Sequence, residues 1–214
     1  MPMPDEPPLW HSRGYLPHYD DGAVVQAITY RLWDALPAEV VAKLEEQAHD
    51  DEKRRLALEH YLDAGHGSCI LRASRNAKIV ANGWRHFEGT RYRLHAWVVM
   101  PNHVHVLIHP LAGRTISEIM QAEKSFTAKA IAAGSAGLRP ADKRNAGETP
   151  ALPERHVWQA DYYDRFIRNE RHYAATVDYI HQNPVKAGLV ARAEDWPWSS
   201  ARDWERGRPA RPMV

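Results

Sequence analysis

The chain has 214 residues, which is enough for one compact domain with terminal extensions. Its 28 lysine and arginine residues nearly balance 27 aspartate and glutamate residues, so a polyanion site must come from local clustering, not from the net charge of +1. The single cysteine, Cys69, excludes an intrachain disulfide and a zinc site built from cysteines. No apolar run approaches the ~20 residues of a membrane helix, so we expect a cytoplasmic protein with no membrane partner.

Composition divides the chain into regions. Residues 1–8 are proline-rich and acidic, and residues 10–19 are aromatic and basic, so we expect residues 1–22 to form a partly disordered N-terminal arm. Residues 23–204 form the expected domain, and 205–214 a C-terminal tail. Within the domain, residues 134–153 break every hydrophobic period and are rich in glycine, alanine, proline and charge, which predicts a flexible insertion.

The first half of the domain has one strand and three helical stretches. Alternating, β-branched residues at 24–32 predict a strand. Helical spacing then follows Pro37, recurs at 58–62, and recurs again over 70–87. Gly89 is expected to end that last helix.

The second half begins with the most strand-like region, residues 92–109. Pro101-Asn102 divides it into two apolar runs, which predicts a hairpin. Thr115 and Glu118 then form a capping box, which predicts the start of a helix. The apolar residues that we expect this helix to bury are Ile116, Ile119, Met120, Phe126, Ala130 and Ile131.

A final helix is predicted to begin at Asn169 and to end at Pro184. Its expected buried stripe contains Tyr173, Val177 and Ile180. The order of strand, helices, hairpin, helix and final helix predicts an α+β domain. We expect an antiparallel sheet with the helices packed mainly on one face.

His103-Val104-His105 interrupts an apolar strand with two imidazoles. Because side chains alternate along a strand, both rings point to one face, about 7 Å apart along the chain, and can reach one metal ion. Histidines on a half-exposed strand can also be plain surface residues. The apolar setting favours the metal site, since burying two polar groups there costs free energy.

Tyr179 and Asn183 lie four residues apart near the end of the final helix and share a face of it. Taken alone, they could be a tyrosine at the edge of the core and an ordinary residue before a proline. Combined with the histidine pair, the Asn183 amide oxygen would complete a ligand set of two nitrogens and one oxygen, which suits Mg²⁺ or Mn²⁺. Tyr179 would then lie beside a metal-bound phosphate.

Long segments of the chain resemble a known family. Residues 96–108, AWVVMPNHVHVLI, resemble the HUH motif of single-strand tyrosine transposases. Residues 162–190 resemble the nucleophile helix of the REP-associated tyrosine transposases. Residues 195–200, DWPWSS, are similar to that subfamily's C-terminal signature, and residues 13–18, RGYLPH, to the start of one branch. The resemblance implies the RRM-like fold of HUH endonucleases.

The resemblance also implies roles for individual residues. His103 and His105 would bind a metal, and Asn183 would complete the site, where classical insertion-sequence relatives have glutamine. Tyr179 would attack DNA and become linked to its 5′-phosphate. If the aligned tyrosine is misjudged, Tyr163 is the next candidate; Tyr179 is preferred because, of the two, it has an amide four residues later.

Several side chains are candidates for DNA binding. Basic residues that flank the predicted site in sequence are Lys124, Arg165, Arg168, Arg171 and Lys186. They could contact backbone phosphates or simply form solvated helix faces. Arg13 and Tyr15 could contact a short single-stranded guide sequence, as the resemblance implies. The tryptophans of residues 196–204 could stack on bases or cap the core.

These observations define three hypotheses. The first is a metal-dependent endonuclease and strand transferase that acts on single-stranded or hairpin DNA from palindromic repeats through a 5′-phosphotyrosine intermediate. The second is a catalytically silent nucleic-acid-binding module, and the third is a metal phosphodiesterase that uses water. The histidine pair and the Tyr179–Asn183 pair argue against a silent module. A monomer is the working expectation, although the sequence does not determine the oligomeric state.

Overall fold

The computed structural model describes the backbone of residues 10–12, 17–19, 24–37, 39–42, 51–111, 113–136 and 156–205. Its elements are β1 (Trp10–Ser12), β2 (Pro17–Tyr19), β3 (Gln26–Arg31), α2 (Asp51–Asp63), the 3₁₀ turn η1 (Ile70–Arg72), α3 (Ser74–His86), β4 (Tyr92–Val99), β5 (His103–Pro110), α4 (Ile116–Ala136), β6 (Tyr163–Phe166), α5 (Glu170–Lys186), the 3₁₀ turn η2 (Ala193–Asp195) and α6 (Ala201–Glu205). Arg13, Tyr15, most of the predicted insertion and most of the tail lie outside the described residues. No helix in the described ranges combines the length and apolar character needed to cross a bilayer.

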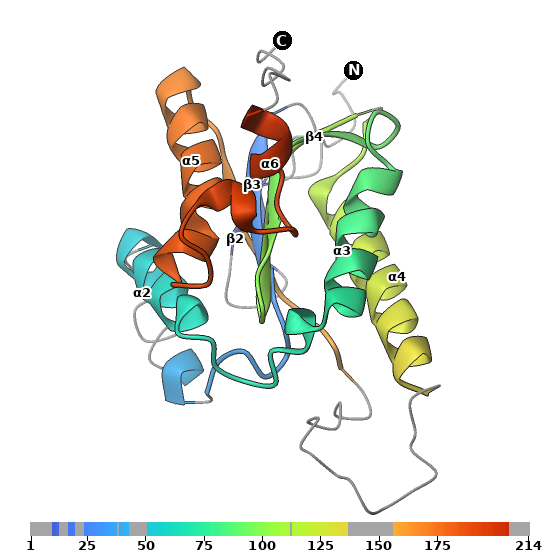
Figure 1. Ribbon diagram of the computed structural model, residues 1–214. Coiled ribbons are helices and arrows are strands. Elements are labelled where there is room, and N and C mark those ends of the chain that lie inside the picture. Colours follow the sequence, from blue (N-terminus) through green and yellow to red (C-terminus); the bar gives the residue numbers. More distant parts are fainter. Residues whose placement is uncertain are drawn as a thin grey trace, which may run out of the picture.

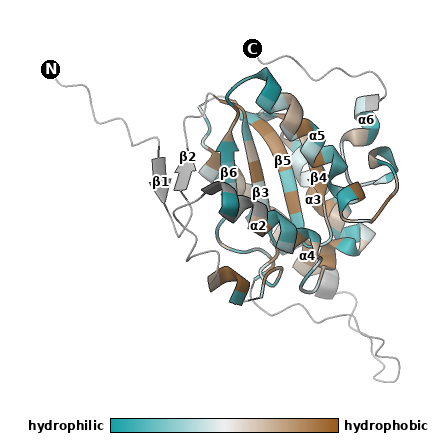
Figure 2. Cartoon of the chain, turned by 90° about the vertical axis from the view of Figure 1, so that its left-hand side faces the viewer, coloured by the Kyte–Doolittle hydropathy of each residue, from teal (hydrophilic) through white to brown (hydrophobic). Residues whose placement is uncertain are grey.

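A four-stranded antiparallel sheet in the order β4-β5-β3-β6 forms the centre of the fold. The chain order of strand, helices, two strands, helix and strand is the βαββαβ arrangement of ferredoxin-like and RRM-like domains. The α+β class and the antiparallel sheet expected from the sequence are therefore confirmed. β1 and β2 form a separate antiparallel pair. Figure 2 shows β6, β3 and β5 of the central sheet side by side.

Helices lie on both faces of the sheet, not mainly on one. α3 and α4 lie on one side, whereas α5 and α2 lie on the other (Figure 1). The reason is that both faces of the central strands are apolar. In β5, Val104 and Val106 belong to the cluster that packs under α3 and α4, whereas Leu107 belongs to the cluster under α5. An apolar face must be covered to be removed from water, so each face needs its own helices.

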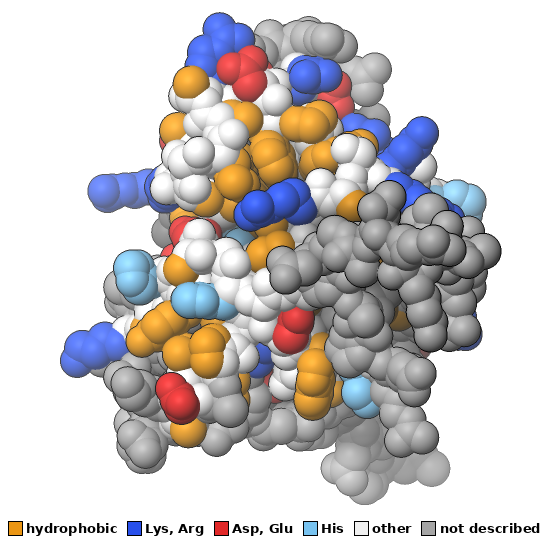
Figure 3. All heavy atoms as spheres, turned by 60° about the horizontal axis from the view of Figure 1, so that its bottom comes forward, with side chains coloured by type: hydrophobic (Ala, Val, Ile, Leu, Met, Phe, Trp, Pro, Cys, Tyr) orange, Lys and Arg blue, Asp and Glu red, His pale blue; other side chains and the backbone are white. Residues whose placement is uncertain are grey.

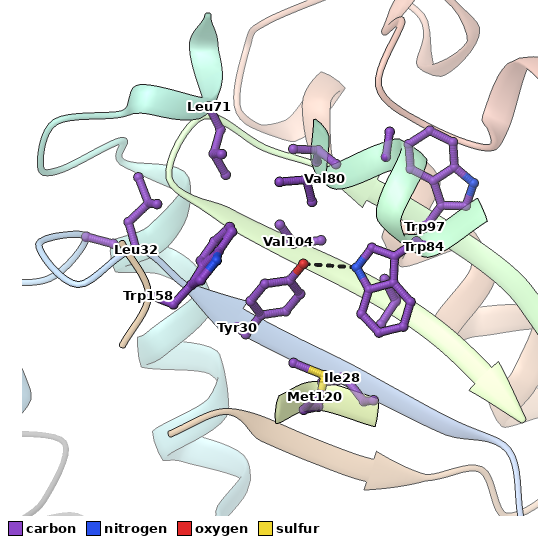
Figure 4. Packing of buried hydrophobic residues seen from close by; sticks show 14 of the residues in the cluster. Ile28, Tyr30, Leu32, Leu71, Val80, Trp84, Trp97, Val104, Met120 and Trp158 are labelled. Atoms are coloured by element: carbon purple, nitrogen blue, oxygen red, sulfur yellow. Dashed lines mark hydrogen bonds between the residues drawn. The ribbon is translucent and has the colours of Figure 1, made fainter. Parts of the chain in front are cut away.

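The larger core lies between the sheet and the α3–α4 pair, and it contains hydrogen-bonded aromatic residues (Figure 4). The Trp84 indole N–H donates to the Tyr30 hydroxyl at 2.9 Å. The Trp158 ring lies 4.8 Å from the Tyr30 ring, and its own N–H donates to Thr127. Each polar atom of these aromatic side chains therefore has a partner in the core, which avoids the 1–3 kcal/mol or so that an unsatisfied buried group costs.

Two predicted helices are present, but their boundaries differ from those predicted. The helix expected over 70–87 is divided, because Ala73 is extended (φ −67°, ψ 118°) between η1 and α3. The last helix continues past Pro184 to Lys186, so the expectation that Pro184 ends it is wrong. A proline this close to the C-terminus removes only one helical hydrogen bond, and Gly188, with φ of 67°, follows the helix end.

α4 begins at the predicted capping box. The Thr115 hydroxyl accepts from the Glu118 N–H, and the Glu118 carboxylate accepts from the Thr115 N–H.

Phe126 of α4 was expected to be buried, but its side chain is 57% exposed. Glu123 and Thr127 are buried instead. Glu123 Oε1 accepts from the Tyr92 hydroxyl, and the Thr127 hydroxyl donates to the Glu123 carbonyl oxygen, which the apolar pattern of the sequence did not predict. Gly134, expected in the insertion, is still within α4.

The buried Glu123 carboxyl predicts a pH-dependent stability. Burial raises its pKa from 4.5 to about 7, so its contribution is fully present below pH 4.5 and is lost as pH rises through about 7. A pKa rise of this size corresponds to about 3 kcal/mol. We expect Glu123→Gln, which cannot ionise, to become more stable relative to wild type by up to that amount between pH 5 and pH 8. Urea unfolding at both values measures the difference, and an unchanged difference would contradict the assignment.

Candidate metal and nucleophile site

The histidine pair lies on β5, on the sheet face that α5 covers. His103 and His105 share this face, and Val104 between them packs into the opposite core, as the strand alternation predicts. The two imidazoles are 4.7 Å apart between ring centroids. They are only 1% and 2% exposed, so the alternative of plain surface histidines is wrong.

The hydrogen bonds of Asn102 determine the tautomer of His103. The Asn102 amide nitrogen donates to the carbonyl oxygens of Leu62 and His66 at 3.2 and 3.1 Å. Its oxygen therefore faces His103 Nδ1 at 2.8 Å and can only accept, so Nδ1 carries the proton. This leaves a lone pair on His103 Nε2. The sequence pattern predicts Asn102 only as a turn residue, although its position next to the histidine pair was a signal of this role.

His105 has the same tautomer for a similar reason. The Asn183 amide nitrogen lies 3.3 Å from His105 Nε2 and donates to it, so Nε2 is the acceptor. His105 Nδ1 then donates to the Thr29 hydroxyl at 2.7 Å. Thr29 is directly opposite His105 in the sheet, which explains how β3 orients the ring. Thr29 was not predicted, because strand pairing cannot be derived from the local sequence.

Burial keeps both imidazoles neutral. Desolvation lowers the pKa of His103 to about 3, and it lowers the pKa of His105 well below its ordinary value, with the neighbouring His103 and Lys186 adding to the effect. A neutral imidazole with a free Nε2 is the form that binds a metal ion. In both rings the unprotonated nitrogen is Nε2; that of His103 has no hydrogen-bond partner, and that of His105 accepts from the Asn183 amide.

α5 brings Tyr179 and Asn183 over the histidines. The helix begins at Asn169, whose side chain accepts from the His172 N–H, and it buries Val177 and Ile180 as predicted. Asn183 is completely buried, one turn beyond the half-buried Tyr179. The Tyr179 ring lies 5.3 Å from the His105 ring at an angle of 81°.

The donor atoms present fit a divalent metal ion. His103 Nε2 and Asn183 Oδ1 are both buried and have no hydrogen-bond partner, so each has an unused lone pair. Among the described residues, no three His, Cys, Asp or Glu side chains are grouped to hold a metal. A ligand set here therefore needs the Asn183 amide, whose oxygen would come to face His105 by rotation of the side chain. Two imidazoles and one oxygen suit Mn²⁺ or Mg²⁺.

Asp63 is an acidic neighbour of this site that no sequence motif singled out. Its Oδ1 lies 3.9 Å from His103 Nε2 and is buried without a hydrogen-bond partner. Burial, together with the negative charge of Glu59, raises the Asp63 pKa to about 6, although Lys186 opposes the shift. The side chain adds negative charge beside the histidines. Lys186 places its ammonium 4.8 Å from the centre of the Tyr179 ring.

The structure separates the other predicted residues into two groups. Arg165 and Lys186 lie near Tyr179, and Arg168 is exposed, with its guanidinium 5.6 Å from the centre of the Phe166 ring. Lys124 is not brought to the site: its ammonium donates to the carbonyl oxygens of residues 159–161 at 2.9 to 3.0 Å. Burial lowers the Lys124 pKa to about 8.

The neighbouring tyrosines Tyr162 and Tyr163 point to different parts of the structure. The Tyr163 side chain lines the same pocket as Tyr179, because Tyr163 lies opposite Thr29 in the sheet. The Tyr162 hydroxyl instead lies 3.3 Å from the Ser117 hydroxyl on α4, and its ring packs against the larger core. Tyr163 therefore remains a candidate nucleophile by position, whereas Tyr162 does not lie at the site.

The C-terminal tryptophans cap the core. The Trp196 indole N–H donates to the Val99 carbonyl at 3.0 Å, and the Trp204 ring packs at 5.2 Å from His181 on α5. Ser200 joins these elements, because its hydroxyl bonds to His181 Nε2 at 2.8 Å and accepts from the backbone N–H of Trp97. This segment links the edge strand β4 to the helix that carries Tyr179, which explains its dense tryptophan and serine content.

Positive charge is not concentrated on the face that Figure 3 shows. Lys and Arg side chains are scattered there, with carboxylates between them (Figure 3). This scattered charge agrees with the net charge of +1. Attraction for a polyanion must therefore come from individual basic side chains at the site.

The segment that carries the site resembles a known family. Residues 83–183, which contain the histidine pair, Tyr179 and Asn183, match the family described as "Transposase IS200 like". This part of the chain is similar to members of that family. A solved structure of a REP-associated tyrosine transposase bound to a REP hairpin has the same fold, with a TM-score of 0.53 and 19% identity over 92% of this chain and 87% of that one.

The chain is also similar in sequence to REP-associated tyrosine transposases. It is 32% identical over 117 residues to the REP-associated tyrosine transposase of Escherichia coli (strain K12), a match that covers 54% of this chain and 59% of that protein. It is also 43% identical over 47 residues to a putative REP-associated tyrosine transposase of Haemophilus influenzae, covering 22% of this chain and 27% of that protein. The matches thus span less than two thirds of either relative.

Proposed function

We propose that the chain is a metal-dependent endonuclease and strand transferase for single-stranded DNA, with hairpin-forming repeats as its substrate. The observation that carries this proposal is the convergence of two neutral imidazoles, a buried amide and a tyrosine at one place on the sheet. The relationship to REP-associated transposases supports the choice of substrate, since one solved relative is described as bound to a REP hairpin.

Tyr179 is the proposed nucleophile. Its oxygen forms a bond to the scissile phosphorus, the bond from phosphorus to the 3′-oxygen breaks, and the phenolic proton is balanced by the proton that the leaving 3′-hydroxyl gains. The product is a phosphodiester between Tyr179 and the 5′ end of one strand. One phosphodiester replaces another, so a free 3′-hydroxyl can reverse the reaction and join a new strand without ATP.

The surrounding residues lower the barrier to this step. A phenol has a pKa near 10 and is a poor nucleophile at neutral pH. The Lys186 ammonium, 4.8 Å from the Tyr179 ring, stabilises developing negative charge on the phenolic oxygen. His103, His105 and Asn183 would hold a divalent ion. Such an ion, when bound, neutralises phosphate charge and makes phosphorus more electrophilic.

The proposal is tested with labelled oligonucleotides that carry repeat hairpins and single-stranded flanks. Incubation with Mg²⁺ or Mn²⁺ should give both a shortened strand and a protein-linked strand on a denaturing gel. EDTA should abolish both. A shortened strand without a protein adduct would favour a metal phosphodiesterase that uses water. Binding without any cleavage would favour a silent binding module.

A further inference from the structure

A pocket of about 260 Å³ opens between β3, β6 and α5, next to the proposed nucleophile. Tyr179 and His105 form part of its wall, and Ala27 and Thr29 of β3 line its base. The α5 residues that face it include Ala175. Because Ala27 and Ala175 are small, the space between helix and sheet stays open here.

The opposite wall comes from β6. Tyr163 and Arg165 pair with Thr29 and Ala27 across the sheet, so their side chains alternate onto the same face and line the pocket. The pocket therefore combines an aromatic ring, a guanidinium group and a mainly apolar base. An apolar space with an aromatic side chain and a few polar groups is typical of sites that stack and orient a nucleobase.

The acidic residue Glu59 indicates which part of a nucleotide enters. Its side chain also lines the pocket. A carboxylate repels a phosphate but accepts hydrogen bonds from the exocyclic amino group of a base. Arg165 of β6 also lines the pocket, and its guanidinium group can attract the phosphate that follows the base. The polarity of the pocket thus favours a base inside and the sugar-phosphate chain outside.

We propose that this pocket binds one base, with an exocyclic amino group, from a nucleotide that flanks the scissile phosphate. The inference rests on the proposed function and adds a determinant of sequence preference at the cleavage position. The volume is below the roughly 300–1,000 Å³ of sites for drug-sized ligands, which suits one base and not a run of nucleotides. With Tyr179 in its wall, the pocket positions the phosphate of the bound nucleotide near the attacking oxygen.

Two exposed alanines on α5 allow a matched test. Ala175 lines the pocket and its neighbour Ala174 does not. Ala175→Phe should fill the space and slow cleavage about ten-fold, the range expected for loss of one stacked base. Ala174→Phe introduces the same side chain on the same helix and should cleave like wild type. Equal effects of both variants would overturn the proposal.

An abasic substrate shows whether a base is the occupant. An abasic nucleotide at one of the two positions flanking the cleavage site should slow the wild-type enzyme about ten-fold. The same substrate should cause no further loss in Ala175→Phe, because the variant has already lost the contact. Additive losses, or no loss at either flanking position, would overturn the proposal.

A binding measurement separates this inference from the proposed function. With EDTA present, 2-aminopurine at the sensitive position should change its fluorescence on binding to wild type and to Ala174→Phe, but not to Ala175→Phe. This pattern without cleavage in metal would support the pocket while the proposed function fails. Normal cleavage with no fluorescence change in wild type would overturn the pocket while the proposed function stands.

Discussion

Replacing Tyr179 with phenylalanine is expected to abolish the covalent protein–DNA adduct and to reduce cleavage by roughly 10³-fold or more. The change removes one oxygen from a half-buried side chain, so packing of the ring against His105 should remain. Hairpin binding should be within about two-fold of wild type, since the hydroxyl is not among the groups expected to bind the DNA backbone. Denaturing gels, gel-shift titrations and peptide mapping of the wild-type adduct measure these three quantities.

Tyr163→Phe is the matched control, because Tyr163 lines the same pocket and also loses only its hydroxyl. This variant should retain the adduct, and peptide mapping should find DNA on Tyr179. If Tyr163→Phe loses the adduct and Tyr179→Phe keeps it, the chemistry stands but the nucleophile is misassigned. If both variants cleave normally, water is the nucleophile and the phosphodiesterase hypothesis is favoured.

Replacing either histidine of the pair with alanine is expected to abolish metal binding and cleavage together. Groups outside a ligand shell already contribute roughly 10- to 100-fold to metal affinity, so loss of a direct ligand should cost at least about 100-fold. Mn²⁺ binding followed by electron paramagnetic resonance measures this without any DNA. His105→Ala also leaves Thr29 and the Asn183 amide without their partner, which should cost about 1–3 kcal/mol of stability while the protein stays folded.

His109→Ala provides the control for this experiment. His109 is on β5 and has the same strand parity as His103 and His105, but it lies near the strand end, opposite Arg93 in the sheet. The His109→Ala variant should bind Mn²⁺ and cleave DNA like the wild-type protein. Unchanged Mn²⁺ affinity in both His103→Ala and His105→Ala would contradict the metal site. Thermal melts of all three variants show whether a loss of function reflects unfolding.

The arrangement of helices explains how this fold can support cleavage. In RRM-like domains one sheet face packs against helices and the other face is available to bind nucleic acid. Here α3 and α4 cover the first face, and α5 lies over the second (Figure 1). The histidine pair is on that second face, so the helix places Tyr179 and Asn183 directly over it. The sheet face that binds nucleic acid in other proteins is here enclosed around the proposed reaction site.

The local sequence determined those parts of the site that depend on periodicity. Strand alternation is a property of the backbone, so it placed His103 and His105 on one face before any tertiary contact was known. Helical spacing likewise placed Asn183 one turn from Tyr179. The Thr115–Glu118 capping box also depends only on residues three apart, and it is present as predicted.

Tertiary structure decided everything that depends on which segments meet. Thr29 orients His105 only because β3 pairs with β5 in one register, and Asn102 orients His103 only because the end of α2 occupies its amide nitrogen. Lys124 turned toward backbone carbonyls and Phe126 toward solvent for the same reason. Periodicity predicts which side chains share a face of an element, but the neighbour of that face is set by long-range packing and the need to satisfy each buried polar atom.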